Sequence, residues 1–344
     1  MNRKSLAIAL LSLVLILGSS KAVAADPGGE RGSQGHHPHQ PGPKAALLVS
    51  GLAGGSGSTV GPGGALYVAE PAAGKITRVD PRTGHKTTFV SGLPQMNPAV
   101  GVGGAMDVAF IGRTAYVLVT LVSPDVGGSD VDGIYRVDGP HSFSVVADIG
   151  QFSIDNPPDT TFFVPTGVQY AMEPYRGGFL VTDGHHNRVL RVKLDGEVTE
   201  LMAFDNVVPT GLAVSGNTIY MAEAGPVPHL PQDGKVVAFG PKSSVVKEVA
   251  AGASLLVDVE FGRGRDLYAL SQGPGVPGAP DGSPAQPNTG ALVKVTRDGG
   301  LDVIVDELDR PTSLEFIGNT AYVVTLTGQI WKIEDVSGPP FGGH

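Results

Sequence analysis

The sequence has no cysteine among its 344 residues. Disulfide bonds and thiol catalysis are therefore excluded, and if the chain is exported its core alone must hold it together. The sequence also lacks a Gly-x-Ser-x-Gly elbow, a His-Glu-x-x-His motif, a phosphate-binding loop and a Gly-x-Gly-x-x-Gly turn that opens a helix. No common catalytic motif therefore identifies an enzyme class.

Basic residues are few and scattered. The chain carries 24 Lys and Arg against 33 Asp and Glu, a formal net charge of -9, and no basic cluster. Nucleic acid and anionic membrane surfaces are poor partners for such a chain. A cation or a neutral organic ligand is easier to accommodate.

The N-terminal hydrophobic run is too short to span a membrane. It extends from Leu6 to Leu17, whereas a transmembrane helix needs ~20 residues. Arg3 and Lys4 precede the run and the small residues Ala22–Ala24 follow it. This pattern predicts a signal peptide over residues 1–24, cleaved near Ala24–Ala25. We expect a protein that is secreted to the extracellular space or the periplasm, without membrane insertion.

Two segments of the chain contain almost no apolar side chains. Residues 25–43 are rich in Gly, Pro and His, and residues 337–344 are rich in Gly and Pro. Because such segments cannot bury enough surface to offset the entropy of ordering, we expect a disordered linker and a flexible tail. Residues 44–336 remain, and they are expected to form one domain.

A short apolar phrase recurs six times in this domain, with tyrosine at the centre of five copies. The copies are Leu66-Tyr67-Val68, Ala115-Tyr116-Val117, Phe179-Leu180-Val181, Ile219-Tyr220-Met221, Leu267-Tyr268-Ala269 and Ala321-Tyr322-Val323. Each phrase has strand-like segments before and after it, separated by Gly-containing turns. The pattern predicts an all-β fold, a six-bladed β-propeller with four-stranded blades.

The last repeat lacks its fourth strand, because the chain enters the tail after Ile333. The segment Ala46–Leu52 closely resembles Thr88–Leu93, the expected outer strand of the first repeat. We therefore predict that an N-terminal strand at about residues 46–52 completes the last blade and closes the ring, which would remove the exposed sheet edges.

The phrasing of the repeats resembles known propellers. The segment Leu180–Val192, followed by Asp195-Gly196, is similar to an NHL-type repeat. Over residues 46–334 the chain resembles the bacterial ScyD/ScyE family, in phrases such as Gly63–Glu70, Thr77–Gly84 and Val90–Pro94. This resemblance implies an NHL-type six-bladed propeller and no settled catalytic activity.

Four long insertions are expected on one face of the ring. In a propeller, the loops that enter the innermost strands and those between second and third strands emerge together at the mouth of the central channel. The insertions occupy these places: Thr120–Asp132, Asp148–Phe163, Ala224–Gly234 and Ser271–Gly290. They indicate either a binding surface mounted on a rigid scaffold or tolerated surface insertions.

Polar residues repeat in register toward that face. Asp107 and Asp258 share one position in the innermost strands of blades two and five. The other candidates are Gln169, Glu260 and Glu315, two residues further along those strands, Glu70, Asp183 and Glu223 at the ends of second strands, and His229 in a loop. Carboxylates that converge from several blades can hold Ca²⁺ or act as a general acid or base.

Structural explanations stand beside these functional ones. Asp107 and Asp258, the candidate metal ligands, can instead accept backbone N–H bonds where their strands begin. Asp183 and Arg188 match a pair that hydrogen-bonds within the blade in NHL repeats, as the resemblance implies.

Two functional hypotheses remain. The first is a monomeric, exported propeller that binds a small molecule or a protein partner through its loop-rich channel-mouth face. The alternative is a divalent-cation-dependent, lactonase-like or lyase-like enzyme. We favour binding.

Overall fold

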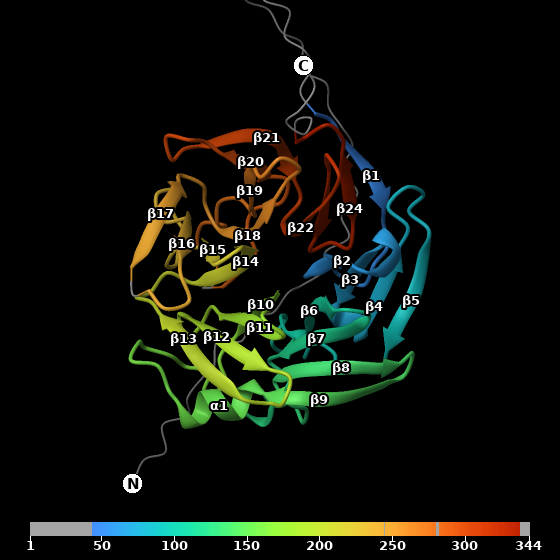
Figure 1. Cartoon of the computed structure of the whole chain (residues 1–344), viewed down its shortest axis with the longest axis vertical. Helices are drawn as coiled ribbons and strands as arrows, with labels where there is room; N and C mark the ends of the chain where they lie inside the picture. Colours follow the sequence, from blue (N-terminus) through green and yellow to red (C-terminus); the bar gives the residue numbers. More distant parts are fainter. Residues whose placement is uncertain (1–42, 244, 280–281, 338–344) are drawn as a thin grey trace, which may run out of the picture.

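The computed structural model describes residues 43–243, 245–279 and 282–337. In this part of the chain, six four-stranded sheets stand around a common centre, as Figure 1 shows. The predicted six-bladed β-propeller is therefore confirmed. The predicted signal peptide, the linker up to residue 42 and the tail from residue 338 lie outside the described residues.

The strands of the first three blades follow one another from the channel to the outer edge. Blade one contains β2 (Ser58–Val60), β3 (Leu66–Glu70), β4 (Lys75–Val79) and β5 (Lys86–Ser91). Blade two contains β6 (Gly104–Ile111), β7 (Thr114–Thr120), β8 (Gly133–Gly139) and β9 (Ser142–Asp148). Blade three contains β10 (Gln169–Tyr175), β11 (Gly178–Asp183), β12 (Arg188–Lys193) and β13 (Val198–Ala203).

The other three blades repeat this antiparallel order. Blade four contains β14 (Pro209–Ser215), β15 (Thr218–Glu223), β16 (Lys235–Phe239) and β17 (Val246–Ala251). Blade five contains β18 (Leu256–Phe261), β19 (Leu267–Ser271), β20 (Gly290–Val295) and β21 (Leu301–Leu308). Blade six contains β22 (Pro311–Ile317), β23 (Thr320–Thr325), β24 (Ile330–Ile333) and β1 (Ala45–Val49).

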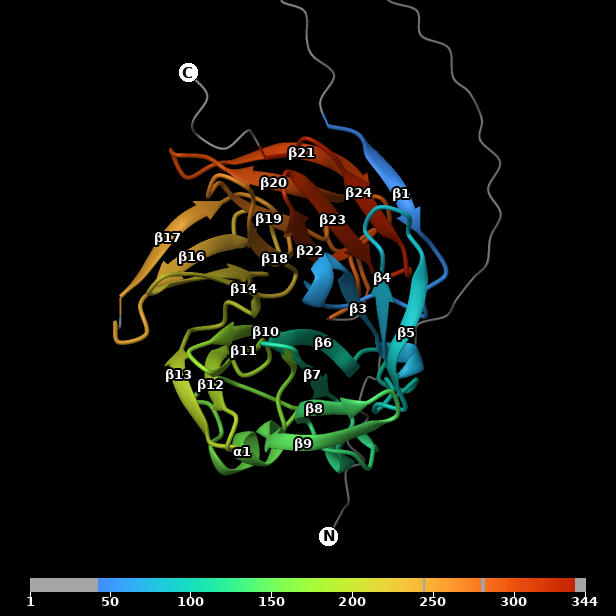
Figure 2. The same ribbon diagram turned by 45° about the vertical axis from the view of Figure 1, so that its right-hand side comes forward.

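The outer strand of blade six comes from the start of the domain. β1 pairs antiparallel with β24, with Ala45 opposite Ile333 and Leu47 opposite Trp331. Figure 2 shows β1 lying along the edge of β24, although the two strands are almost a whole domain apart in sequence. The predicted fourth strand is thus present, at Ala45–Val49 instead of about residues 46–52.

Helical structure is sparse. α1 (Ile149–Asp155) follows blade two, and three short 3₁₀ turns occur at Pro62–Gly64, Pro71–Ala73 and Pro124–Val126. Asp148 caps α1, because its side chain accepts a hydrogen bond from the backbone N–H of Gln151. Within the described ranges, no helix combines the length and apolar character needed to cross a membrane.

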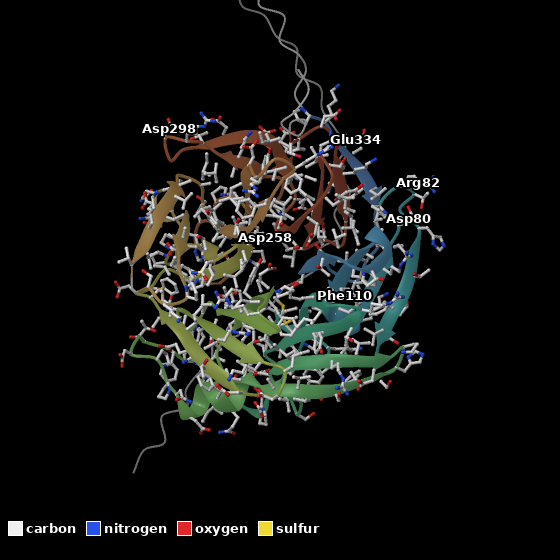
Figure 3. All side chains as sticks on the ribbon, in the orientation of Figure 1. Asp80, Arg82, Phe110, Asp258, Asp298 and Glu334 are labelled. Carbon is white, nitrogen blue, oxygen red and sulfur yellow. The ribbon has the colours of Figure 1, made fainter. Side chains whose placement is uncertain are left out.

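The six recurring phrases form the second strands and lie in the core, where Tyr220 of blade four is the one central residue that is only partly buried. Every residue of β3 and of β11 is buried. Tyr67 of blade one packs edge-to-face on Phe110 of blade two, labelled in Figure 3, with ring centroids 4.7 Å apart. Aromatic contacts of this kind join neighbouring blades in a protein without disulfide bonds.

The inner strand of blade three is not where local sequence likeness would place it. The segment Pro165–Tyr170 resembles the start of β14, but β10 begins only at Gln169 and runs to Tyr175. A two-residue turn at Arg176 and Gly177 joins it to β11. The hairpin fixes the register, and it outweighs the local likeness of the Pro-Thr-Gly segment to its counterpart.

The end of the domain also departs slightly from expectation. Ser337, which we assigned to the tail, is buried and its Oγ accepts a hydrogen bond from the backbone N–H of Arg263 at 3.2 Å. The hydroxyl of Tyr268 donates to the carbonyl of Val336 at 3.1 Å. The packed domain therefore reaches residue 337.

Candidate functional site

Asp107 and Asp258 lie at equivalent positions in β6 and β18, as predicted, and Figure 3 shows Asp258 near the middle of the ring. Each carboxyl group ties its blade to the next one. Asp107 accepts hydrogen bonds from the backbone N–H groups of Val108, at 2.8 Å, and of Met172 in blade three, at 2.7 Å. Asp258 accepts hydrogen bonds in the same way from the backbone N–H groups of Val259 and of Leu314 in blade six, the latter at 2.7 Å.

Glycine in the preceding blade makes room for each of these carboxyl groups. A Cβ atom at Gly57 would lie 2.0 Å from Oδ1 of Asp107, and one at Gly211 would lie 2.3 Å from Oδ1 of Asp258. Burial raises the pKa of Asp107 to about 8 and that of Asp258 to about 7, although the backbone N–H donors act to lower both pKa values. Both residues therefore act as structural ties between blades.

Three glutamates face the channel from blades three, five and six. Glu173, Glu260 and Glu315 are half-buried and are paired with the central residues of their second strands. Burial raises the pKa of all three, that of Glu173 to about 8, and neighbouring carboxyl groups raise it further. The channel is thus lined by acids that hold their protons more strongly than in water.

Contrary to our prediction, Gln169 does not face the channel with Glu260 and Glu315. Glu173 occupies the equivalent position in blade three. Gln169 is buried within its blade, where its side-chain oxygen accepts a hydrogen bond from the Thr120 hydroxyl at 2.8 Å. Glu173 lies seven positions before Leu180, the interval that also separates Glu315 from its tyrosine. Counting back from the second strand would have found it.

The channel leaves little free space. The hydroxyl of Tyr170, on β10, reaches the carbonyl of Thr312, on β22, at 3.4 Å. A cavity of about 50 Å³ remains among the channel side chains. Pockets for drug-sized molecules measure roughly 300–1,000 Å³, so this cavity suits water or a small ion.

A calcium ion fits these residues poorly. Both oxygens of Asp107 and of Asp258 already accept backbone N–H bonds. Among the residues that the structure describes, no three Asp, Glu, His or Cys side chains are gathered closely enough to hold a metal ion. Ca²⁺ takes six to eight oxygen ligands, and the channel would have to rearrange to supply them.

Glu70, at the end of β3, is a fully paired carboxylate. One of its oxygens accepts a hydrogen bond from the Ala53 N–H at 2.6 Å, and the other accepts one from the Thr77 hydroxyl. Lys75, its cross-strand neighbour, lies 3.3 Å away. Glu70 therefore stabilises its own blade.

Asp183 holds the same place in blade three and is also paired. It accepts hydrogen bonds from the N–H groups of Val168 and His186, and the His186 ring and Arg188 guanidinium lie 3.2 Å and 3.6 Å away. Burial opposes ionisation of Asp183, but His186 and Arg188 outweigh it and hold its pKa below the usual value. The NHL resemblance implied a hydrogen bond between Asp183 and Arg188, whereas the structure shows an ion pair without a hydrogen bond between them.

Glu223, which ends the second strand of blade four as Glu70 and Asp183 end theirs, is not paired. The residue as a whole is 4% exposed, and its carboxyl group makes no hydrogen bond or ion pair with any residue in the described ranges. Burial raises its pKa to about 7, partly offset by the charge of Lys235 and reinforced by that of Glu248. The carboxyl oxygens of Glu223 are not fully enclosed, because they keep contact with solvent at a groove. A carboxyl group with a raised pKa and no protein partner marks a candidate site.

The two neighbouring strands explain why Glu223 is unpaired. Val237 stands where blade one has Thr77, so the hydroxyl donor is missing. Glu248 stands where blade one has Thr88, and its carboxylate binds Lys235 at 2.7 Å, away from Glu223.

The backbone donor is missing as well. The N–H groups of Val207 and Val208, in the loop that enters blade four, both donate to the side-chain oxygen of Asn187, at 3.0 and 2.9 Å. In blade one, the corresponding loop donates to Glu70 through Ala53. Blade four thus lacks both hydrogen-bond donors that hold Glu70, and its lysine forms its ion pair with Glu248 instead.

A groove of about 800 Å³ opens beside Glu223, between blades three and four. It is bounded by residues 157–160 of the long loop before β10, by the turn after β11 and by the outer strands β13 and β17. Glu200, Asp205, Glu223 and Glu248 line it together with Lys235. The groove has the size of a small-molecule site, and one of the four loops that we predicted to form a binding face, Asp148–Phe163, borders it.

His229 is not brought to either cavity. Its Nδ1 lies 2.7 Å from the carbonyl oxygen of Gly225, within its own loop. Its side chain lines neither the channel cavity nor the groove.

The sequence matches no family model and no curated protein. Its fold is similar to that of a gluconolactonase from Xanthomonas campestris (12% identity, 85% of this chain and 89% of that chain, TM-score 0.58). It is also similar to a luciferin-regenerating enzyme (12% identity, 88% and 98%, TM-score 0.58) and to virginiamycin B lyase from Staphylococcus aureus (14% identity, 85% and 98%, TM-score 0.51). At such identities the likeness concerns the fold alone. The chain shares the six-bladed architecture of gluconolactonase-type and lyase-type propellers.

Proposed function

We propose that this protein binds a small organic ligand in the groove between blades three and four. The observation that carries the proposal is Glu223, a residue only 4% exposed, which lines a groove of about 800 Å³ and whose carboxyl group has no hydrogen bond or ion pair with the described residues. The equivalent carboxyl groups, Glu70 and Asp183, are neutralised by partners within their blades. A group that the fold leaves unsatisfied can be satisfied by a ligand.

This proposal keeps the binding hypothesis but moves its place. We expected the ligand at the channel mouth, whereas Tyr170 and the small volume of the channel cavity favour the groove beside it. The proposal includes two expectations from the sequence, membership of the ScyD/ScyE family and export by a signal peptide. A binding protein of that family would need no catalytic motif.

The alternative function, a cation-dependent enzyme, would need the channel side chains to rearrange around the ion. Five carboxyl groups, those of Asp107, Glu173, Asp258, Glu260 and Glu315, line one cavity in a fold that gluconolactonases and lyases also use. A divalent cation held there would make the chain a lactonase-like or lyase-like enzyme. Calorimetric titration with Ca²⁺ tests it: stoichiometric binding that Glu260→Gln and Glu315→Gln abolish would favour the enzyme.

The groove itself is tested with a library of charged and uncharged fragments, observed by NMR. Fragments should shift the resonances of Phe204 and Val207, which line the groove. Ala203→Trp should abolish these shifts, because it places a large ring in the groove, and Thr199→Trp on the same strand should not. Shifts confined to channel residues, or no shifts at all, would contradict the proposal.

A further inference from the structure

The charged side chains around the groove are mostly acidic. Glu200, Asp205, Glu223 and Glu248 line it, with Asp159 from the loop before β10. The lysine of the groove, Lys235, is already paired with Glu248 at 2.7 Å. A positive charge would therefore be attracted to the groove and a negative one repelled.

The pairing of Glu70 indicates what Glu223 needs. Glu70 receives two hydrogen-bond donors and the positive charge of Lys75. A ligand ammonium group provides hydrogen-bond donors and a positive charge together. It can therefore replace the hydroxyl donor that is absent at Val237 and the lysine charge that is paired with Glu248.

The rest of the groove wall is apolar and suits an organic body. Phe204, Val207, Val237 and Val246 line it beside Pro158. Burial of an apolar group against these side chains would add to the affinity, because it removes apolar surface from water. A bare metal ion would gain nothing from this wall, and Glu223 alone cannot supply its oxygen ligands.

From these contacts we infer that the ligand is an organic cation, whose protonated amine binds Glu223 and whose apolar part lies on Phe204 and the valines. This inference rests on the proposed function, because it names the chemical class of the ligand for the same groove.

Three probes with one ring and different head groups test the inference: 2-phenylethylammonium, 2-phenylethanol and 3-phenylpropanoate. Binding is measured by NMR titration at pH 8 with the full chain. The ammonium should bind at least about tenfold more tightly than the alcohol, as one charge-assisted hydrogen bond provides, and the carboxylate should bind most weakly.

Two variants separate a specific contact from general charge. Glu223→Gln should weaken the binding of the ammonium about tenfold or more and leave that of the alcohol unchanged. Glu197→Gln removes one negative charge at an exposed pair with Lys193, outside the groove, and should change neither.

Each other result overturns the inference. Equal affinities of ammonium and alcohol would do so while leaving groove binding intact, and so would an ammonium affinity that Glu223→Gln does not change. If none of the three probes binds, a cationic ligand of this class is ruled out. The fragment experiment with Ala203→Trp then decides separately whether the groove binds anything.

Discussion

Glu70 and Glu223 end the second strands of blades one and four at the same ladder position, each opposite a lysine, yet only Glu70 is paired. The difference has a local cause, since Thr77 and Thr88 of blade one are replaced by Val237 and Glu248. In blade one the carboxylate therefore stabilises its own blade, and in blade four it lies unpaired beside a groove. Departures from local consistency of this kind are expected at functional sites.

The partner that blade four lacks can be restored. In Val237→Thr the new hydroxyl should donate to Glu223, as Thr77 does to Glu70, and lower the pKa of Glu223 below about 7. The binding of the ammonium probe should weaken, because Glu223 then has a competing donor. An NMR titration of Glu223 measures the pKa. Val237→Ala, which adds no donor, is the control, and an equal fall of the pKa in both variants would contradict this explanation.

Binding of an organic cation should depend on pH. Glu223 must be ionised to pair with the ammonium group, and its pKa in the free protein is raised to about 7. Because His186, Glu200, Asp205, Lys235 and Glu248 also line the groove, the midpoint belongs to the group as a whole. Affinity should rise as pH rises from 5.5 to 8.5, by about tenfold, and should do so less in Glu223→Gln. An affinity that falls over this range would exclude Glu223 as the anchor.

The ties between blades should matter for stability. Asp107→Ala leaves the N–H groups of Val108 and Met172 without their acceptor, so the free energy of unfolding should fall by about 2–4 kcal/mol. Asp107→Asn keeps one acceptor oxygen and should cost less. Urea denaturation at pH 6 measures both, and Thr87→Ala, on the exposed outer strand of blade one, is the control. A loss no larger than that of the control would show that Asp107 is not a structural tie.

The channel glutamates should destabilise the fold when they ionise. Burial and neighbouring carboxyl groups raise the pKa of Glu315 well above its usual value. A carboxyl group that binds its proton more tightly in the folded chain contributes stability at low pH, and this contribution is lost as pH rises through its folded pKa. Glu315→Gln should therefore unfold at a higher temperature than the wild type at pH 9 and at a similar temperature at pH 4.5. A lower melting temperature at both pH values would contradict this.

The fold was predictable because its signals are local. Turn residues and the apolar–aromatic phrases such as Leu66-Tyr67-Val68 recur in each blade, and the likeness of the N-terminal segment to Thr88–Leu93 placed β1 at the edge of the last sheet. The register of blade three was not predictable from local likeness. A Pro-Thr-Gly segment at Pro165 copies the start of β14, whereas the hairpin at Arg176 determines the pairing.

The candidate site was predictable only in part. Glu223 was found as a member of a repeated column, but its lack of partners depends on Val237 and Glu248, on two other strands. Aligning the third and fourth strands of all blades would have revealed both replacements. The closing of the channel by Tyr170 could not be read from the repeats, because it joins β10 to β22 across the ring.

The central claim is that Glu223 serves a ligand and Glu70 serves the fold, and the free energies of unfolding of Glu223→Gln and Glu70→Gln at pH 8 test it most directly. Glu70→Gln should lose about 1–3 kcal/mol, because an amide cannot accept both of its hydrogen bonds or pair with Lys75. Glu223→Gln should gain stability, by roughly 2–3 kcal/mol at most, because it removes a buried charge whose pKa burial has raised to about 7. An equal loss in both variants would contradict the account.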